Sequence, residues 1–306
     1  MLKNLLEERI LILDGAMGTA IQQYQLEEKD FRGEEFVNHP VNLKGNNDIL
    51  SLTRPDIISR IHQSYIDAGA DIIETNTFNS NAVSQADYQC SADVYRLNYA
   101  GARLAREVAD KAGRPVYVAG SIGPTSKTLS LSPDVNQPAF RAIDFDTLAA
   151  TYAQQISGLI DGGVDILLVE TVFDGLNAKA ALYAIDKIQT EKATRLPVMI
   201  SATINDKSGR TLTGQSLEAL YTALAHYPLF SFGLNCSFGA KELLPFVEQL
   251  HKFLPCNLSL YPNAGLPNEM GEYDESPDYT AAFLKSMAQK GWLNIAGGLS
   301  LIHISE

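Results

Sequence analysis

Short apolar runs rich in β-branched residues recur along the chain, separated by longer stretches of mixed polarity. Each run is bounded by Gly, Pro, Asn or Asp, which is typical of buried parallel strands. Eight runs of this kind are present, and we expect a strand at each. They lie near residues 10–13, 71–73, 116–119, 166–169, 198–202, 230–234, 258–261 and 293–296.

Stretches with helical periodicity fill the intervals between these runs. The stretch 55–69 gathers Ile58, Ile61 and Ile66 on one helical face. It begins with Pro, which suits a first helical turn, and it ends with Gly, which suits a helix end. The other helices are expected at roughly 93–112, 144–162, 175–190, 214–227, 239–254 and 277–290.

Eight strands alternating with helices predict an α/β fold, a (β/α)8 TIM barrel, which typically needs about 250 residues. A doubly wound sheet is the main alternative. The segment Gly15-Ala16-Met17-Gly18, however, lacks the Gly-x-Gly-x-x-Gly spacing with which such sheets bind a dinucleotide. The interval 22–53 is polar and rich in Gly and Asn, so we expect a loop insertion over one barrel end. No linker divides the chain, and we expect a single domain over residues 1–298.

Composition and charge narrow the classes of function. The chain of 306 residues carries 24 Lys and Arg against 36 Asp and Glu, a formal net charge of −12. This charge disfavours nucleic acid and anionic membranes as partners and favours a small molecule. The three cysteines are an odd and sparse set, which argues against a disulfide framework and for a reducing compartment. Because no signal peptide or membrane span is recognisable, we expect a cytoplasmic protein.

Small and polar residues follow the predicted strands, where a barrel enzyme assembles its site. Two of them, Asp14 and Glu170, are carboxylates that end apolar strands, so each needs donors or a cation to offset its desolvation. A substrate's α-ammonium group would satisfy both. The alternative is structural, with Asp14 capping a turn and Glu170 paired with a buried Arg. The other strand-end segments are Glu74-Thr75-Asn76, Gly120-Ser121, Asn235-Cys236, Asn263-Ala264-Gly265 and Gly297-Gly298.

Cys236 is the cysteine best placed for chemistry. It ends a strand beside Asn235, and the following Ser-Phe-Gly opens a loop at the expected barrel mouth. A lone cysteine is more often a small buried hydrophobe, and we interpret Cys90 and Cys256 in that way. The residues predicted around one mouth of the barrel are Asp14, Glu170, Cys236 and Asn263.

Six strand-end motifs are distinctive as a set. They are Leu13-Asp14-Gly15-Ala16-Met17-Gly18-Thr19, Glu74-Thr75-Asn76-Thr77-Phe78-Asn79, Gly120-Ser121-Ile122-Gly123-Pro124, Val169-Glu170-Thr171, Gly233-Leu234-Asn235-Cys236 and Pro262-Asn263-Ala264-Gly265. In their order and positions they resemble the homocysteine S-methyltransferase family, and the resemblance covers residues 1–298. Longer segments are similar to the amino-terminal, homocysteine-binding module of cobalamin-dependent methionine synthases. These segments span residues 43–48, 132–136, 208–215 and 265–268.

The resemblance implies a barrel in which zinc binds homocysteine as a thiolate, and the thiolate attacks a methyl group. Zinc is needed because a free thiol, with a pKa near 8.5, is mostly protonated at neutral pH. Cys236 matches the first zinc cysteine, and Asn263 lies where the family has a polar group near the metal. The substrate-binding residues implied are Asp14, Gly15, Ala16, Glu170 and Asn263.

The resemblance also implies partners for this barrel. In cobalamin-dependent methionine synthases the methyl group is carried as methylcobalamin by another module, and methyltetrahydrofolate replenishes it. We therefore expect homocysteine as the substrate and the folate-binding and cobalamin-binding modules of a full-length protein as partners.

The chain departs from the family directly after Gly297-Gly298. The family continues with two adjacent cysteines, whereas this chain has Leu299 and Ser300, so the zinc site is incomplete. His303 could substitute only if the tail folded back into the barrel mouth. We expect residues 299–306 to be foreign sequence after a truncation, and we expect this chain to be inactive alone.

Three functions remain open at this point. The first is the homocysteine-activating module of a methionine synthase, which the longer matching segments favour. The second is a stand-alone homocysteine S-methyltransferase that uses S-methylmethionine or betaine. The third is a catalytically inactive fragment that binds an amino acid. Metal content and the methyl donor distinguish these alternatives.

Overall fold

The computed structural model describes residues 2–265 and 275–298. The predictions made for Leu299, Ser300, His303 and the tail 299–306 lie outside the described residues.

Eight parallel strands form one sheet that is nearly closed into a barrel. The strand order is β1-β8-β7-β6-β5-β4-β3-β2, and a parallel bridge between Leu13 and Ile72 joins the two end strands. The predicted TIM barrel and all eight predicted strands are therefore confirmed. The strands are β1 Leu11–Ile12, β2 Ile72–Glu74, β3 Tyr117–Ile122, β4 Ile166–Val172, β5 Val198–Ala202, β6 Ser231–Gly239, β7 Asn257–Asn263 and β8 Ile295–Ala296.

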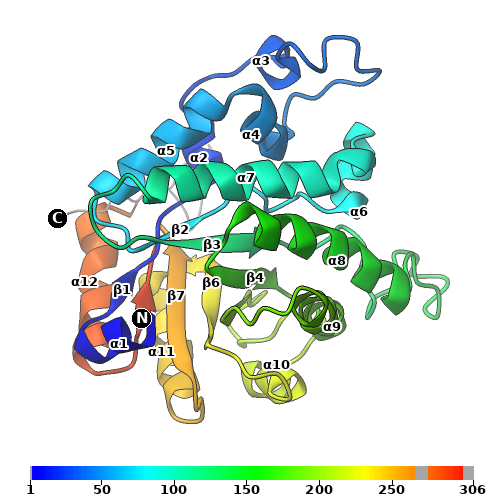
Figure 1. Cartoon of the computed structure of the whole chain (residues 1–306). Helices are drawn as coiled ribbons and strands as arrows, with labels where there is room; N and C mark the ends of the chain where they lie inside the picture. Colours follow the sequence, from blue (N-terminus) through cyan, green and yellow to red (C-terminus); the bar gives the residue numbers. More distant parts are fainter. Residues whose placement is uncertain (1, 266–274, 299–306) are drawn as a thin grey trace.

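Helices lie around the outside of the barrel, between successive strands of the chain (Figure 1). Polar residues begin several of them: the Asp144 carboxylate accepts from Thr147 N at 2.7 Å, and the Asp174 carboxylate accepts from Leu176 N at 2.9 Å. All seven predicted helices are confirmed. They are α5 Pro55–Asp67, α7 Val94–Ala109, α8 Phe145–Gly162, α9 Gly175–Glu191, α10 Leu217–Leu224, α11 Ala240–His251 and α12 Pro277–Gln289.

Alternate residues of each strand face opposite sides of the sheet, which divides the core in two. On the outer side, residues such as Ile73, Val118 and Leu167 pack against the helices. On the inner side, a separate cluster that includes Ile72 and Leu168 fills the barrel. Helix α1 (Leu2–Glu8) packs against this inner cluster.

The interval 22–53 was predicted to be a polar loop, and this prediction is wrong. The segment folds into short helices around its own apolar cluster, which includes Phe31, Leu43 and Leu50 and packs against α5. The segment has few apolar residues, but hydrogen bonds also order it. The Arg32 guanidinium donates to four backbone carbonyls between residues 36 and 41. The helices are α2 Met17–Gln22, α3 Glu28–Arg32, η1 Asn47–Ile49 and α4 Leu50–Thr53.

Three further short helices follow β2 and precede α7. They are α6 Ala82–Gln85, η2 Ala86–Tyr88 and η3 Ser91–Asp93. Within the part of the chain that the structure describes, no helix is both long and apolar enough to cross a membrane.

Candidate functional site

The predicted site residues all lie at the carboxyl ends of barrel strands. Asp14 follows β1, Glu170 lies near the end of β4, Cys236 lies near the end of β6 and Asn263 ends β7. Because the strands are parallel, these positions share one end of the barrel, which we call the mouth. Glu74, which ends β2, lies at the same end.

Three carboxylates meet at the mouth: Asp14, Glu74 and Glu170. The Glu74 backbone N–H donates to Asp14 Oδ2 at 3.0 Å, and the Ser121 hydroxyl donates to Glu170 Oε1. Asp14 Oδ1 is buried and accepts no hydrogen bond. Among residues 2–265 and 275–298, no Lys, Arg or His forms an ion pair with any of the three.

This arrangement raises the pKa of each of the three carboxyl groups. Burial raises the pKa of Glu170 to about 7, although the Ser121 hydroxyl opposes the shift. Burial is also the main cause of the raised pKa of Asp14, to which the Glu170 charge adds. The pKa of Glu74 is raised first by burial, then by the charges of Glu170 and Asp14. The mouth therefore favours a bound cation or bound protons.

Two irregularities in the strand ladders set the direction of Glu170 and Cys236. Val169 pairs with Ile200 and Val172 pairs with Ala202, so Glu170 and Thr171 lie opposite Ser201 alone. Between β6 and β7, the three residues 236–238 lie opposite Pro262 alone. Bulges of this kind re-aim side chains and are common beside active sites.

The backbone is strained at the same two places. Thr171, Cys236 and Ser237 have positive φ angles of 56°, 59° and 66°. Each such residue costs on the order of 1 kcal/mol or more and persists only where its surroundings hold it. Asn235 supplies part of that support, since its Oδ1 accepts from Thr171 N at 3.2 Å and its Nδ2 donates to Thr171 Oγ1 at 2.9 Å.

The turn after β1 is held by Tyr65 of α5. The Tyr65 hydroxyl donates to the Ala16 carbonyl at 3.3 Å. A Cβ atom on Gly15 would lie 2.8 Å from Tyr65 Cε1, so only glycine fits beneath the ring. The tyrosine thereby fixes Gly15 and Ala16 beside the Asp14 carboxylate.

The three cysteines occupy different environments. Cys236 is half-buried at the mouth, while Cys90 is fully buried outside the barrel, where its thiol donates to the Tyr88 carbonyl at 3.3 Å. Cys256 is partly buried and immediately precedes β7. Over the described ranges 2–265 and 275–298, no group of three or more His, Cys, Asp or Glu residues is arranged to hold a metal ion.

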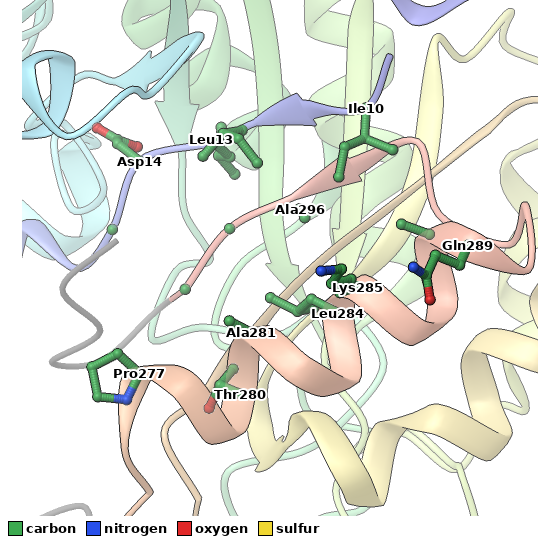
Figure 2. Close-up of a pocket in the computed structure, with 15 residues that line it drawn as sticks. Ile10, Leu13, Asp14, Pro277, Thr280, Ala281, Leu284, Lys285, Gln289 and Ala296 are labelled. Atoms are coloured by element: carbon green, nitrogen blue, oxygen red, sulfur yellow. The ribbon is translucent and has the colours of Figure 1, made fainter. Parts of the chain in front are cut away.

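A cavity of about 450 Å³ lies between β1, β8 and α12, outside the barrel (Figure 2). Its lining is mainly apolar, with residues such as Ile12, Leu284 and Ala288. Asp14 borders this cavity, but Figure 2 shows its carboxylate on the side of the chain away from α12. Because no set of polar groups converges there, we place the candidate site at the mouth.

The sequence reasoning did not assign Glu74, Ser121 or Tyr261 to the site. Period-two alternation could have found them, because each lies an even number of residues after an inward-facing position. Ile72 precedes Glu74 by two residues, and Ala119 precedes Ser121 by two; both Ile72 and Ala119 belong to the inner cluster.

Comparison with known proteins identifies the family. A family model described as homocysteine S-methyltransferase matches residues 11–299. Two solved structures of the homocysteine methyltransferase MmuM from Escherichia coli share the fold. The oxidized form is 22% identical with a TM-score of 0.73, and the metallated form is 23% identical with a TM-score of 0.72. Each alignment covers 97% of this chain and 94% of the other. The family match spans nearly the whole barrel, and the chain therefore belongs to the homocysteine S-methyltransferase family.

Proposed function

We propose that this barrel binds homocysteine at its mouth and serves as the homocysteine-activating module of a cobalamin-dependent methionine synthase. The observation that carries the first part is the group of three carboxylates, which form no ion pair with a cationic side chain within 2–265 and 275–298. An α-ammonium group would supply the missing charge. The second part is supported by the longer sequence segments that resemble such modules. In this reading, residues 1–298 act as one domain and work with folate-binding and cobalamin-binding modules.

Different residues at the mouth bind different groups of homocysteine. Asp14 and Glu170 hold the α-ammonium group, and the backbone N–H groups of Gly15 and Ala16 receive the α-carboxylate. Cys236 and Asn263 lie at the ends of β6 and β7, beside the place left for the sulfur. Methylation forms a bond between the donor's methyl carbon and this sulfur and breaks the bond between that carbon and the donor. The donor's leaving group keeps the electron pair, and the thiol proton leaves.

The described residues do not fit the zinc ion that the family implies. Catalytic zinc sites use three protein ligands and leave one position open for substrate. Cys236 supplies one thiolate, Asn263 is a neutral oxygen ligand, and no three-residue metal-binding group occurs within 2–265 and 275–298. Leu299 and Ser300 offer no thiol. We therefore assign no step of the reaction to a metal in this chain.

The zinc content of the protein and of three variants tests this part of the proposal. We expect the unmodified protein to retain no stoichiometric zinc after chelation, and a Leu299→Cys, Ser300→Cys variant to gain one zinc per chain. Adding Cys236→Ala to that variant should remove the metal, whereas adding Cys256→Ala should not. Elemental analysis after dialysis against a chelator measures all four proteins. Stoichiometric, chelator-resistant zinc in the unmodified protein would contradict the assignment.

The methyl donor is tested with the zinc-loaded double variant. We expect methionine to form from homocysteine and free methylcobalamin, and not from S-methylmethionine or betaine. Methionine formed from either of the latter would support a stand-alone methyltransferase instead. No methionine with any donor, in a variant that binds both zinc and homocysteine, would favour a catalytically inactive amino-acid-binding protein.

A further inference from the structure

Glu74 faces the interior of the barrel. Side chains alternate along a strand, and Ile72, two residues earlier, belongs to the inner cluster. Glu74 ends β2 and is half-buried, so its side chain lies at the mouth rather than among the outer helices. Its charge acts on Tyr65 and Tyr261, and the charges of Glu170 and Asp14 act on it, which places it among these groups.

Among residues 2–265 and 275–298, no Lys, Arg or His forms an ion pair with this cluster. The carboxylates act on two tyrosines, Tyr65 from α5 and Tyr261 from β7, and Cys236 also acts on Tyr261. Burial and the neighbouring carboxylates raise the pKa of both phenols, so both stay neutral. Asp14 Oδ1 is buried and accepts no hydrogen bond, so acceptor capacity remains unused at the mouth.

Three neighbouring carboxylates that repel one another resist full ionisation when no cation is present. The pKa of Glu170 is about 7, and those of Asp14 and Glu74 are raised as well. The ligand-free cluster therefore favours a bound proton at neutral pH. An amino acid brings a single α-ammonium charge, which would stabilise the ionised form of the whole cluster.

We propose that Glu74 is the third arm of the ammonium site, and that the α-ammonium group of the substrate replaces a proton shared by Asp14, Glu74 and Glu170. The assignment rests on the proposed function, because the ammonium group is that of homocysteine. The exchange balances in protons and in charge. The protonated cluster binds homocysteine in its ammonium form. The carboxylates then hold the ammonium group in their ionised form, and one proton passes to solvent. Binding is accordingly coupled to proton release.

Calorimetric titration of the protein at pH 7 tests this coupling. The ligands are L-homocysteine and 4-mercaptobutanoate, which has the same thiol and carboxylate but no ammonium group. Titrations in phosphate and in Tris, which differ in ionisation enthalpy, give the number of protons released. For homocysteine we expect release of about one proton per site, and for 4-mercaptobutanoate none.

Glu74→Gln is the informative variant. It should weaken homocysteine binding by about tenfold or more, the range of one charge-assisted hydrogen bond, and should reduce proton release. Asp48→Asn is the matched control. Asp48 is also a buried carboxyl group with a raised pKa, but its partners are Asn79 N and Ser80 Oγ, which an amide oxygen can still accept. This control should bind homocysteine and release protons as the parent does.

The outcomes separate the two proposals. Unchanged affinity and proton release in Glu74→Gln would overturn the role of Glu74 while leaving the proposed function intact. Absence of homocysteine binding to the parent would overturn both. Thermal melting of the ligand-free proteins at pH 8 adds a second readout. Glu74→Gln should melt above the parent because it removes like-charge repulsion, and a lower melting temperature would contradict the shared cluster.

Discussion

The two ends of the barrel are built by different rules. Toward the amino end, the inward side chains are apolar, as at Leu11 and Ile166, and the strands pair in regular register. Toward the mouth, inward positions carry charged or polar groups such as Glu74 and Glu170, and two ladders contain bulges. The regular end contributes buried apolar side chains that stabilise the fold. The irregular end holds the candidate site, as in other barrels of this type.

Backbone conformation sharpens this contrast. Most turns that lead into the amino end use glycine where φ is positive, as at Gly69 with φ 105° and Gly163 with φ 95°, although Ala193 adopts a φ of 49° before β5. At the mouth, Gly265 has a positive φ, but so do three residues with side chains, Thr171, Cys236 and Ser237. The protein accepts strain there because glycine would remove the side chains that line the site.

The largest expected difference concerns stability. Ile166→Ala, in the inner cluster, should lower the free energy of unfolding by about 2–5 kcal/mol, because it leaves a cavity in a packed interior. It should leave the affinity for homocysteine within about twofold, because Ile166 lies four residues before Glu170, or about 13 Å along the strand toward the amino end. Urea denaturation and calorimetric titration measure the two effects. A large loss of affinity in a folded variant would show that the two ends are not independent.

The regular part of the fold was predictable because it follows simple periodicities. Runs such as 198–202 are continuous and apolar because both faces of a parallel strand are buried, and β5 occupies this range. The short helices of the insertion 22–53 were not predictable, because the segment is ordered partly by Arg32 contacts with the His39 and Val41 carbonyls, at spacings that match neither a helix nor a strand. Such contacts leave no periodic pattern.

The candidate site was predictable in its strand-end positions and not in its detail. Asp14 and Glu170 stand out as carboxylates that end apolar runs. The bulge that aims Cys236 depends on the register between β6 and β7, which a single sequence does not reveal. The third carboxylate, Glu74, was placed in a strand-end segment but given no role, because its strand is only three residues long and its alternation is hard to recognise.

Substitution of Glu170 should change stability and homocysteine binding in opposite directions. The pKa of this buried group rises from 4.5 in the unfolded chain to about 7 in the folded protein. A raised carboxyl pKa means that stability is lost as the pH rises from about 4.5 through 7. Glu170→Gln removes this loss, so at pH 8 we expect the ligand-free protein to gain up to about 3 kcal/mol in unfolding free energy.

The same variant should bind homocysteine more weakly. In the Leu299→Cys, Ser300→Cys variant, Glu170→Gln should cost about 1.5–3 kcal/mol of binding free energy and leave the zinc content unchanged. Denaturation at pH 5 and pH 8, together with calorimetric titration, measures both effects. Equal homocysteine affinity in the two proteins would remove Glu170 from the site, and equal stability at pH 8 would argue that its burial costs nothing.

The smallest expected effects come from two substitutions that compare backbone strain at the two ends of the barrel. Ser237→Gly should raise the free energy of unfolding by up to about 1 kcal/mol, because glycine adopts a φ of 66° without steric cost. Gly163→Ala should lower it by about 1 kcal/mol, since the new Cβ would lie 3.6 Å from Arg106 Cγ, an ordinary contact, and the cost comes from φ alone. Urea denaturation of both variants gives the two values. If Ser237→Gly destabilised the protein instead, the left-handed backbone at the mouth would not be strained, and its side chains would be placed there at no energetic cost.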